Sequence, residues 1–243
     1  MKSITYKSGD FALWVLGDTH IDHPNTDIKT LQRHIDMIQD SGAPWIHLGD
    51  WVDCINPLDK RFSVRDNREA IVDAYLKAEQ MFNPIVDQGV AILRGNHGSK
   101  WSRIEGDMIR VMAKRWGIPY LGYCGFIKFR MPKRSYVLWV HHGAGGGRKR
   151  GAKAIRLQDW SGFVDADVYL QGHTHTYQNF VDEQVRFSSK RTRYFGNVPG
   201  YIRSYRGHDN YIEELGLPPQ PIGMLQVEFG TGKREVEIQP VIE

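Results

Sequence analysis

Short apolar runs that end in glycine and a polar residue alternate with helical patterns through the first two-thirds of the chain. Strands are predicted at 13–16, 45–48 and 90–93. Apolar residues at helical spacing predict a helix that includes Ile28, with Thr26 as its N-cap and Gly42 as its end. A second helix is predicted over 66–82. The residues that mark a third helix are Ile104, Met108, Val111 and Met112.

After Gly117 the pattern changes, and strands are predicted at 126–129, 136–140 and 168–170. One helical stretch, at about 152–160, lies between the last two of these strands. From 178 onward the chain is mainly β-structure, with strands at 191–195, 223–229 and 235–241. This order predicts a layered α/β fold with one mixed sheet and one later sheet. Because the sequence has no internal repeat and no low-complexity linker, residues 1–243 are expected to form a single domain.

Five segments rich in glycine, aspartate, asparagine and histidine follow or close the predicted strands. They are Gly17-Asp18-Thr19-His20, Gly49-Asp50, Gly95-Asn96-His97, His141-His142-Gly143 and Gly172-His173-Thr174-His175. Strand ends at one edge of an α/β sheet converge, so residues far apart in sequence share one site there. A sheet edge has no packing need for two carboxylates, an amide and at least four imidazoles. The joint pattern therefore predicts a metal site.

These segments, in this order, resemble the calcineurin-like metallophosphoesterase family, whose pattern runs D-x-H, G-D, G-N-H, a histidine that closes a strand, and G-H-x-H. The resemblance covers roughly residues 13–176. It implies a four-layer α-β-β-α sandwich, with two mixed sheets flanked by helices, and a site for two divalent metal ions. The protein-phosphatase branch is disfavoured, because Trp51-Val52-Asp53-Cys54 follows Asp50 where that branch has an arginine.

Carried over residue by residue, the resemblance implies two ligand sets. Asp18, His20 and His175 would bind the first cation, Asn96, His142 and His173 the second, and Asp50 would bridge them. His97 would lie beside the substrate phosphate. Either His141 or His142 can be the fourth-segment ligand, and His142 is favoured because Gly143 follows it, as glycine often does in the family.

A carboxylate between two cations holds them about 3.5–4 Å apart. Such a pair lowers the pKa of a bridging water, so that hydroxide serves as the nucleophile. His97 would then stabilise the transition state or protonate the departing oxygen. Oxygen and nitrogen ligands without thiolate suit manganese, which is favoured here, or iron or zinc. Asp53 is interpreted either as a residue that orients a ligand or as a simple turn carboxylate.

The sequence thus predicts a hydrolase of phosphate esters, with phosphodiesters favoured. The alternative is a DNA nuclease like the family's repair branch, and a non-catalytic binding module on the same fold is less favoured because the whole ligand set is present. The glycine-rich segment 143–147 leads into Arg148, Lys149 and Arg150, which are candidate substrate contacts. It lacks the Gly-Lys-Ser/Thr ending of a nucleotide-binding P-loop. The basic and aromatic residues of 190–206 are interpreted as an ordinary half-exposed strand rather than a nucleic-acid surface.

The net charge of +4 and the pI near 9.0 fit an anionic substrate such as a nucleotide or nucleic acid. The apolar run 11–16 is too short for a signal peptide or a membrane span, so no membrane partner is predicted. Cys54 and Cys124 are expected to be reduced thiols in a cytoplasmic protein. His23, His34, His47 and His208 are expected to be structural or surface residues. The pattern predicts no oligomeric state.

Overall fold

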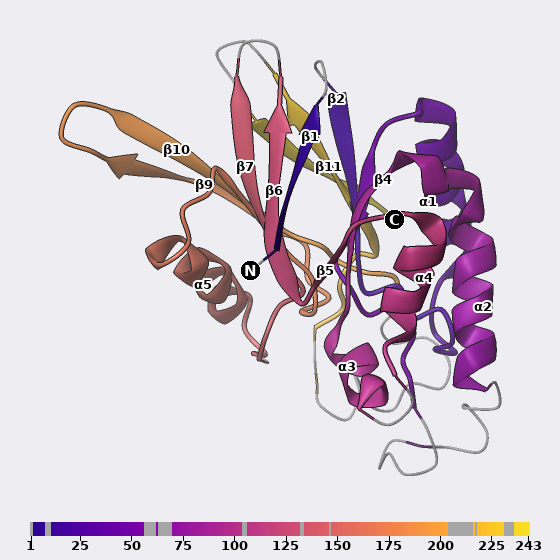
Figure 1. Ribbon diagram of the computed structural model, residues 1–243. Coiled ribbons are helices and arrows are strands. Elements are labelled where there is room, and N and C mark those ends of the chain that lie inside the picture. The colour runs from indigo at the N-terminus through magenta and orange to yellow at the C-terminus, as the bar shows by residue number, and fades with distance from the viewer. Residues whose placement is uncertain are drawn as a thin grey trace.

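The computed structural model describes residues 2–7, 11–55, 62, 70–103, 106–131, 134–145, 147–203, 216, 218–230 and 236–243. Two six-stranded sheets lie face to face (Figure 1). The first, called the β1 sheet, has the order β1 (Lys2–Lys7), β6 (Cys124–Arg130), β7 (Ser135–His141), β8 (Val168–Gln171), β10 (Lys190–Asn197) and β9 (Gln178–Val185). The second, called the β2 sheet, has the order β12 (Val236–Ile242), β11 (Gly223–Phe229), β2 (Phe11–Leu16), β3 (Trp45–His47), β4 (Gly89–Leu93) and β5 (Tyr120–Gly122).

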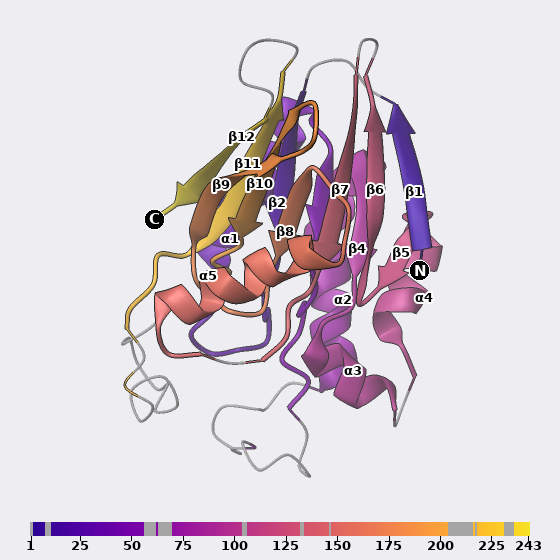
Figure 2. The ribbon, with the colours of Figure 1, turned by 90° about the vertical axis from the view of Figure 1, so that its left-hand side faces the viewer.

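Helices cover the outer face of each sheet. On the β2 sheet these are α1 (Ile28–Ser41), α2 (Ile71–Phe82) and α4 (Met108–Trp116), on the right of Figure 1. On the β1 sheet α5 (Arg150–Asp159) crosses in front of the strands in Figure 2. A short helix, α3 (Asn96–Ser102), begins directly after β4, and 3₁₀ turns follow α2 at Asn83–Gln88 and α5 at Trp160–Gly162. The layers are therefore α-β-β-α, which confirms the predicted fold class.

Three hydrophobic clusters hold these layers together, and β2 shows how a strand serves two of them. Leu13 and Val15 belong to the cluster between the two sheets, whereas Trp14 and Leu16 pack beneath the helices of the β2 sheet. This alternation follows from the two-residue period of a strand. The third cluster lies under α5 and includes Trp139. Among the described helices, none combines the length and the apolar character needed to cross a membrane.

The two sheets are interleaved in sequence, and here the prediction of one mixed sheet and one later sheet was wrong. β1, at the start of the chain, pairs in parallel with β6 of the other sheet. Near the end of the chain, β11 returns to pair with β2, and β12 pairs with β11. A strand's hydrophobic pattern shows which face it buries but not which strand lies beside it, because any apolar strand can pair with any other. β1 itself was not predicted, although Ile4 and Tyr6 alternate with polar residues as in a half-buried strand.

Two helix boundaries also differ from the prediction. Asp27, not Thr26, is the N-cap of α1, because its carboxylate accepts a hydrogen bond from the Thr30 backbone N–H at 3.0 Å. Thr26 instead donates its hydroxyl to the His20 carbonyl oxygen at 2.6 Å. Gly42 ends α1 in the left-handed conformation, as predicted.

The predicted second and third helices are placed differently as well. The second begins at Ile71 after Ala70, and its expected start at 66–69 lies outside the described residues. The expected third helix corresponds to α4, which begins at Met108 because Asp107 caps it. Ile104 and Glu235, expected in a helix and a strand, also lie outside the described residues.

Candidate metal centre

The five predicted segments meet at one edge of the sandwich, at the carboxyl ends of five strands. β2, β3 and β4 are parallel neighbours in one sheet, and β7 and β8 are parallel neighbours in the other. Backbone hydrogen bonds join successive segments, such as Asp18 N–H to the Gly49 carbonyl at 2.9 Å and Gly172 N–H to the His142 carbonyl at 3.0 Å. Parallel strand ends therefore form the crevice in which α/β proteins bind ligands.

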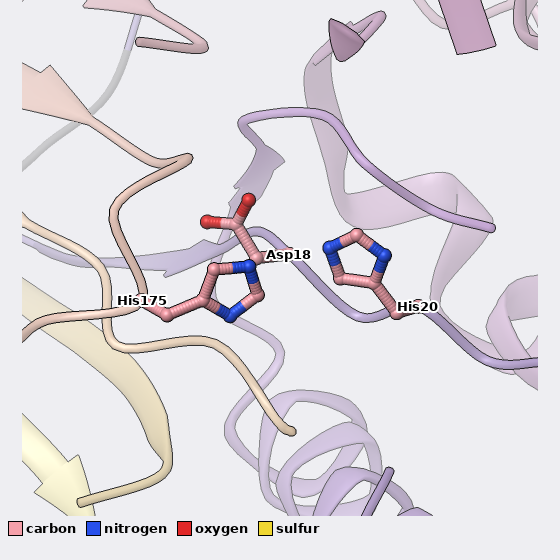
Figure 3. A group of neighbouring side chains, drawn as sticks. All are labelled: Asp18, His20 and His175. Atoms are coloured by element: carbon pink, nitrogen blue, oxygen red, sulfur yellow. The ribbon is translucent and has the colours of Figure 1, made fainter. Parts of the chain in front are cut away.

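One group of side chains at this edge consists of Asp18, His20 and His175 (Figure 3). Their candidate ligand atoms all lie within 4.8 Å of one another. Asp18 and His20 follow β2, whereas His175 comes from the loop after β8 in the other sheet. The rings of His20 and His175 are stacked with their centroids 5.1 Å apart. Figure 3 shows the Asp18 carboxylate beside both rings.

A second group consists of Asp50, His142 and His173, whose candidate ligand atoms are equally close. His142 Nε2 lies 3.2 Å from Asp50 Oδ2 and 2.8 Å from Asn96 Oδ1. A third group, His20, Asp50 and His97, overlaps both others, since the Asp50 carboxylate lies 3.8 Å from His20 Nε2. Asp50 therefore lies between His20 of the first group and His142 of the second.

A hydrogen bond to the backbone fixes which nitrogen of the His142 ring faces the centre. His142 Nδ1 donates to the Leu48 carbonyl oxygen at 2.9 Å, so its Nε2 carries a lone pair in the neutral ring. That lone pair faces the Asn96 and Asp50 oxygens, which are also acceptors. Three electron-rich atoms that converge in this way need a proton or a metal ion between them.

In the Asp18, His20 and His175 group, polar atoms without a partner also indicate that a ligand such as a metal ion belongs there. Asp18 Oδ1 and His20 Nε2 are buried and have no hydrogen-bond partner among the described residues. Buried polar atoms are nearly always bonded, so two such atoms within one cluster call for a further ligand. Both belong to the Asp18, His20 and His175 group. The residues present therefore fit a divalent metal ion at either end of the site.

Asp53 lies directly behind the site and links two of its histidines. Its Oδ1 accepts a hydrogen bond from His20 Nδ1 at 3.0 Å and lies 2.8 Å from His97 Nδ1, which donates to the Asp53 carbonyl oxygen at 2.7 Å. The Asp53 backbone N–H in turn donates to Asp22 at 2.6 Å. A metal-binding histidine commonly donates its second ring N–H to a carboxylate, which fixes the ring's tautomer and orientation. Of the two interpretations of Asp53, the geometry favours the residue that orients a ligand.

The backbone of the site is strained at the predicted ligands. Among the described residues, those other than glycine with positive φ are Asp18 (51°), His20 (38°), Asp50 (50°), Cys54 (53°), His173 (69°) and His175 (46°). All except Cys54 are predicted metal ligands. Left-handed backbone costs roughly 1–2 kcal/mol per residue, so it persists only where the surrounding structure enforces it. Its concentration here is typical of a functional site.

Two glycines let the segments approach closely enough to form the site. A Cβ atom at Gly172 would lie 2.8 Å from Asp18 Oδ2, and one at Gly95 would collide with the Asp50 carboxylate. These oxygens instead accept backbone hydrogen bonds, Asp18 Oδ2 from His173 N–H at 2.7 Å and Asp50 Oδ1 from His97 N–H at 3.0 Å. The sequence pattern of a glycine beside each ligand thus has a steric cause.

Burial and charge shift the ionisation of the cluster. Burial lowers the pKa of His173 to about 4 and holds the pKa of His175 well below its usual range. Both rings are therefore neutral at pH 7, which is the form that binds metal. Burial also acts to lower the pKa of His97, but the Asp50 charge and the Asp53 hydrogen bond outweigh it and raise that pKa to about 9.

His141, the alternative fourth-segment ligand, belongs to a different environment. Its ring lies 4.1 Å from that of Trp160, and its Nδ1 accepts a hydrogen bond from Gly143 N–H at 2.6 Å. Tyr123 packs edge-on against His141 and also against His142, with a centroid distance of 5.3 Å to the latter. Sequence analysis missed Tyr123, because it lies outside all five segments and reaches the site only through the fold.

The other predicted functional residues lie around this centre. Arg148, Lys149 and Arg150 are exposed, directly before and at the start of α5, and the structure shows no contact between them and the cluster in the part of the chain that it describes. Gly146, in the segment 143–147, lies outside the described residues. Two further side chains of α5 reach the site's loops: Lys153 donates to the Thr174 carbonyl at 2.9 Å, and Arg156 donates to the Ala144 carbonyl at 2.9 Å.

Within the segment 190–206, the strand interpretation of 191–195 agrees with β10, which spans Lys190–Asn197. Tyr194, Phe195 and Tyr201 are buried, so their rings offer no surface for stacking. Arg191 pairs with Asp165 and Asp167. Residues 204–206 lie outside the described residues.

The remaining histidines and cysteines have structural surroundings where they are described. The His34 and His47 rings are buried, and His47 stacks on Trp51. Both cysteines are free, and burial raises the pKa of the Cys54 thiol, which lies 3.2 Å from the Tyr75 hydroxyl. His208 lies outside the described residues.

Comparison with solved structures supports the fold. A hypothetical protein from Thermus thermophilus is 12% identical, with 96% of this chain and 98% of that chain covered and a TM-score of 0.51. A metallophosphoesterase from Sphaerobacter thermophilus is 14% identical over 96% and 88% of the two chains, with a TM-score of 0.40. A predicted phosphoesterase from Streptococcus pneumoniae is 14% identical over 96% and 91%, with a TM-score of 0.43. No family model and no curated protein matches the sequence. At these identities the likeness concerns the fold alone, and the Thermus thermophilus structure, with a TM-score above 0.5, supports that fold.

Proposed function

We propose that this chain is a metal-dependent phosphoesterase that hydrolyses phosphodiesters. The observation that carries the proposal is the place of Asp50, whose carboxylate belongs to two groups of candidate ligands at once. A carboxylate shared in this way is the simplest means of holding two divalent cations about 3.5–4 Å apart. Paired cations at that distance are characteristic of enzymes that cleave phosphate esters.

Seven side chains would hold the cations. Asp18, His20 and His175 would bind the first and Asn96, His142 and His173 the second, with Asp50 between them. The donors are carboxylate and amide oxygens and imidazole nitrogens, without thiolate. This set favours manganese, with iron and zinc as alternatives. When bound, such a pair lowers the pKa of water toward neutrality and neutralises charge on phosphoryl oxygens.

His97 has the geometry of the residue that acts on the substrate. It follows β4 at the start of α3, is half-buried, and has its Nδ1 engaged by Asp53. Its Nε2 is therefore left to face the centre, 3.9 Å from Asp50 Oδ2. From there it can donate a hydrogen bond to a phosphoryl oxygen or a proton to the departing oxygen, work that typically contributes a factor of about 10²–10⁴.

The surroundings of the centre support a substrate larger than a simple monoester. Arg148, Lys149 and Arg150 are exposed where the chain leaves His142 for α5. The half-buried Tyr123 ring adds an aromatic surface beside His142. A second ester group that extends from the metals would meet this basic and aromatic rim. The same basic residues favour the second candidate function, a DNA nuclease.

The test begins with protein stripped by a chelator and then reloaded with manganese. We expect hydrolysis of bis-p-nitrophenyl phosphate to return with the metal and to exceed that of p-nitrophenyl phosphate. Asp50→Asn should reduce this turnover to background because the shared ligand loses its charge, whereas Asp40→Asn, on the exposed surface of α1, should have no effect.

Two outcomes would contradict the proposal. Substantial activity in Asp50→Asn would exclude the shared-ligand centre. Faster cleavage of the monoester would exclude the diester preference and leave a phosphatase. The nuclease candidate is tested by incubating the same reloaded protein with end-labelled single- and double-stranded DNA. Metal-dependent cleavage of the DNA would support it, and intact DNA would exclude it.

A further inference from the structure

β9 forms one edge of the β1 sheet, and with β10 it makes a hairpin that projects beyond the rest of the molecule (Figure 1). Large apolar side chains are exposed along it. Val181 is 60% exposed, Val185 is 76% exposed and Phe187, near the turn, is fully exposed. An exposed strand edge that also carries apolar side chains is a surface on which another strand can pair.

Three of the usual protections against such pairing are absent from this strand, although it carries two charged side chains, Asp182 and Glu183. Native edges are commonly guarded by proline, by lysine or by a bulge that bends the strand away. β9 has the sequence QNFVDEQV and pairs with β10 in continuous register over all eight residues. In the part of the chain that the structure describes, β10 is the only strand beside it.

The backbone of the hairpin shows which groups face outward. Arg186 N–H donates to the Ser189 carbonyl at 2.8 Å across the turn. Because hydrogen-bonded and non-hydrogen-bonded pairs alternate in an antiparallel ladder, the backbone groups of Val181, Glu183 and Val185 point away from β10. These groups are available to a further strand.

The edge is complementary to itself in one antiparallel register. With a two-fold axis at Gln184, Asp182 lies opposite Arg186 of the second copy, the residue directly after β9, and Glu183 lies opposite Val185 of that copy. Each contact occurs twice by symmetry. Asp182 and Arg186 occupy non-hydrogen-bonded positions, where facing side chains are closest.

Neighbouring registers lose this match. Moving the axis to Glu183 sets two Glu183 carboxylates opposite each other, which is unfavourable for directly facing like charges. Moving it to Val185 places Gln184 opposite Arg186 and removes the ion pairs. Charge complementarity therefore selects both the occupant, a second copy of this chain, and the register.

We propose that the β9 edge pairs with the β9 edge of a second copy, so that two β1 sheets become one continuous sheet across a symmetric dimer. The pairing is independent of the metal centre, which lies at the carboxyl ends of other strands. The interface is small, so the dimer is expected to depend on protein concentration.

The test is sedimentation velocity over a range of concentrations. Wild type should shift toward the dimer as concentration rises. Asp182→Arg alone sets two arginines opposite each other, and Arg186→Asp alone sets two aspartates opposite each other, so each should weaken association about tenfold or more. An equimolar mixture of the two variants restores both ion pairs and should dimerise, as should the double variant. Asp159→Arg, an exposed residue at the end of α5, is the matched charge control.

Several results would overturn the proposal. A wild type that stays monomeric excludes it, as do single variants that associate like wild type or a mixture that does not. Circular dichroism confirms that each variant is folded, since both positions lie outside the core clusters. Monomeric wild type that cosediments with anionic lipid vesicles, and loses this with Phe187→Ser, would assign the hairpin to a membrane surface instead.

Discussion

The residue that most clearly gains a role from the structure is Asp53. Burial acts to raise the pKa of its carboxyl, but the hydrogen bonds from His20 and His97 outweigh burial and hold that pKa well below its usual range. A charged carboxylate therefore stands behind one proposed metal ligand and one proposed catalytic residue. Its contacts with His20 and His97 give it the geometry of a residue that positions both rings.

Replacing Asp53 with asparagine keeps its shape but removes the charge. We expect metal affinity or turnover to fall by about 10–100-fold, as is typical when a carboxylate behind a metal-bound histidine is lost. Isothermal titration with Mn²⁺ and the diester assay measure the two effects. A glutamate variant, which keeps the charge, should recover part of each. Unchanged affinity and turnover in Asp53→Asn would show that the two hydrogen bonds are incidental.

The sequence predicts which residues meet at this edge of the fold, but it leaves the role of Asp53 open and misses Tyr123. The seven proposed ligands come together because each follows a strand, and parallel strand ends meet at one edge whatever the strand order. Asp53 lies 33 residues from His20, and Tyr123 lies between β5 and β6. Neither contact has a local signature, because it depends on how loops pack. The metal-binding role of the seven side chains stays a prediction.

At the scale of elements, α5 is more than a cover for the β1 sheet. Lys153 donates both to the Thr174 carbonyl and, at 2.5 Å, to the Thr176 hydroxyl. These threonines stand on either side of His175, so the helix holds the loop that presents His173 and His175. Arg156, one turn later, holds Ala144 in the loop after His142. Two proposed ligand loops are thus attached to a single helix.

The change Lys153→Met tests this attachment, because methionine fills a similar space without the donor. We expect Mn²⁺ affinity to fall about tenfold, since the loop that carries His173 and His175 loses its anchor. The matched control is Lys114→Met on the exposed face of α4. If both variants bind Mn²⁺ like wild type, α5 has no part in positioning the loop.

Element boundaries show where local patterns mislead. Thr26 and Asp27 are adjacent, and both residue types cap helices, so the sequence does not decide between them. The fold decides, because the Thr26 hydroxyl is drawn to the His20 carbonyl while Asp27 remains with Thr30. Asp107 likewise caps α4, so this helix begins at Met108, four residues after Ile104, the first residue that marks the predicted third helix.

At the scale of the whole molecule, the layers were predictable and the connections between them were not. Alternating strands and helices followed by β-structure indicate an α/β sandwich. The return of β11 to β2, and the pairing of β1 with β6, depend on long-range contacts that leave no trace in periodicity. This interleaving places the first strand of the chain in one sheet and the last two strands in the other.

Interleaved sheets that share one core should unfold together, as expected of a single domain. Leu138 of the β1 sheet is fully buried in the cluster between the sheets, which also contains Leu13 and Ile46 of the β2 sheet. Leu138→Ala should therefore cost about 2–5 kcal/mol. In native-state hydrogen exchange, the slowest amides of β3 and β4 should lose the same free energy of protection as those of β7 and β8, because both open only by global unfolding. Loss confined to β7 and β8, with β3 and β4 unchanged, would mean that the sheets are separate cooperative units despite their shared core.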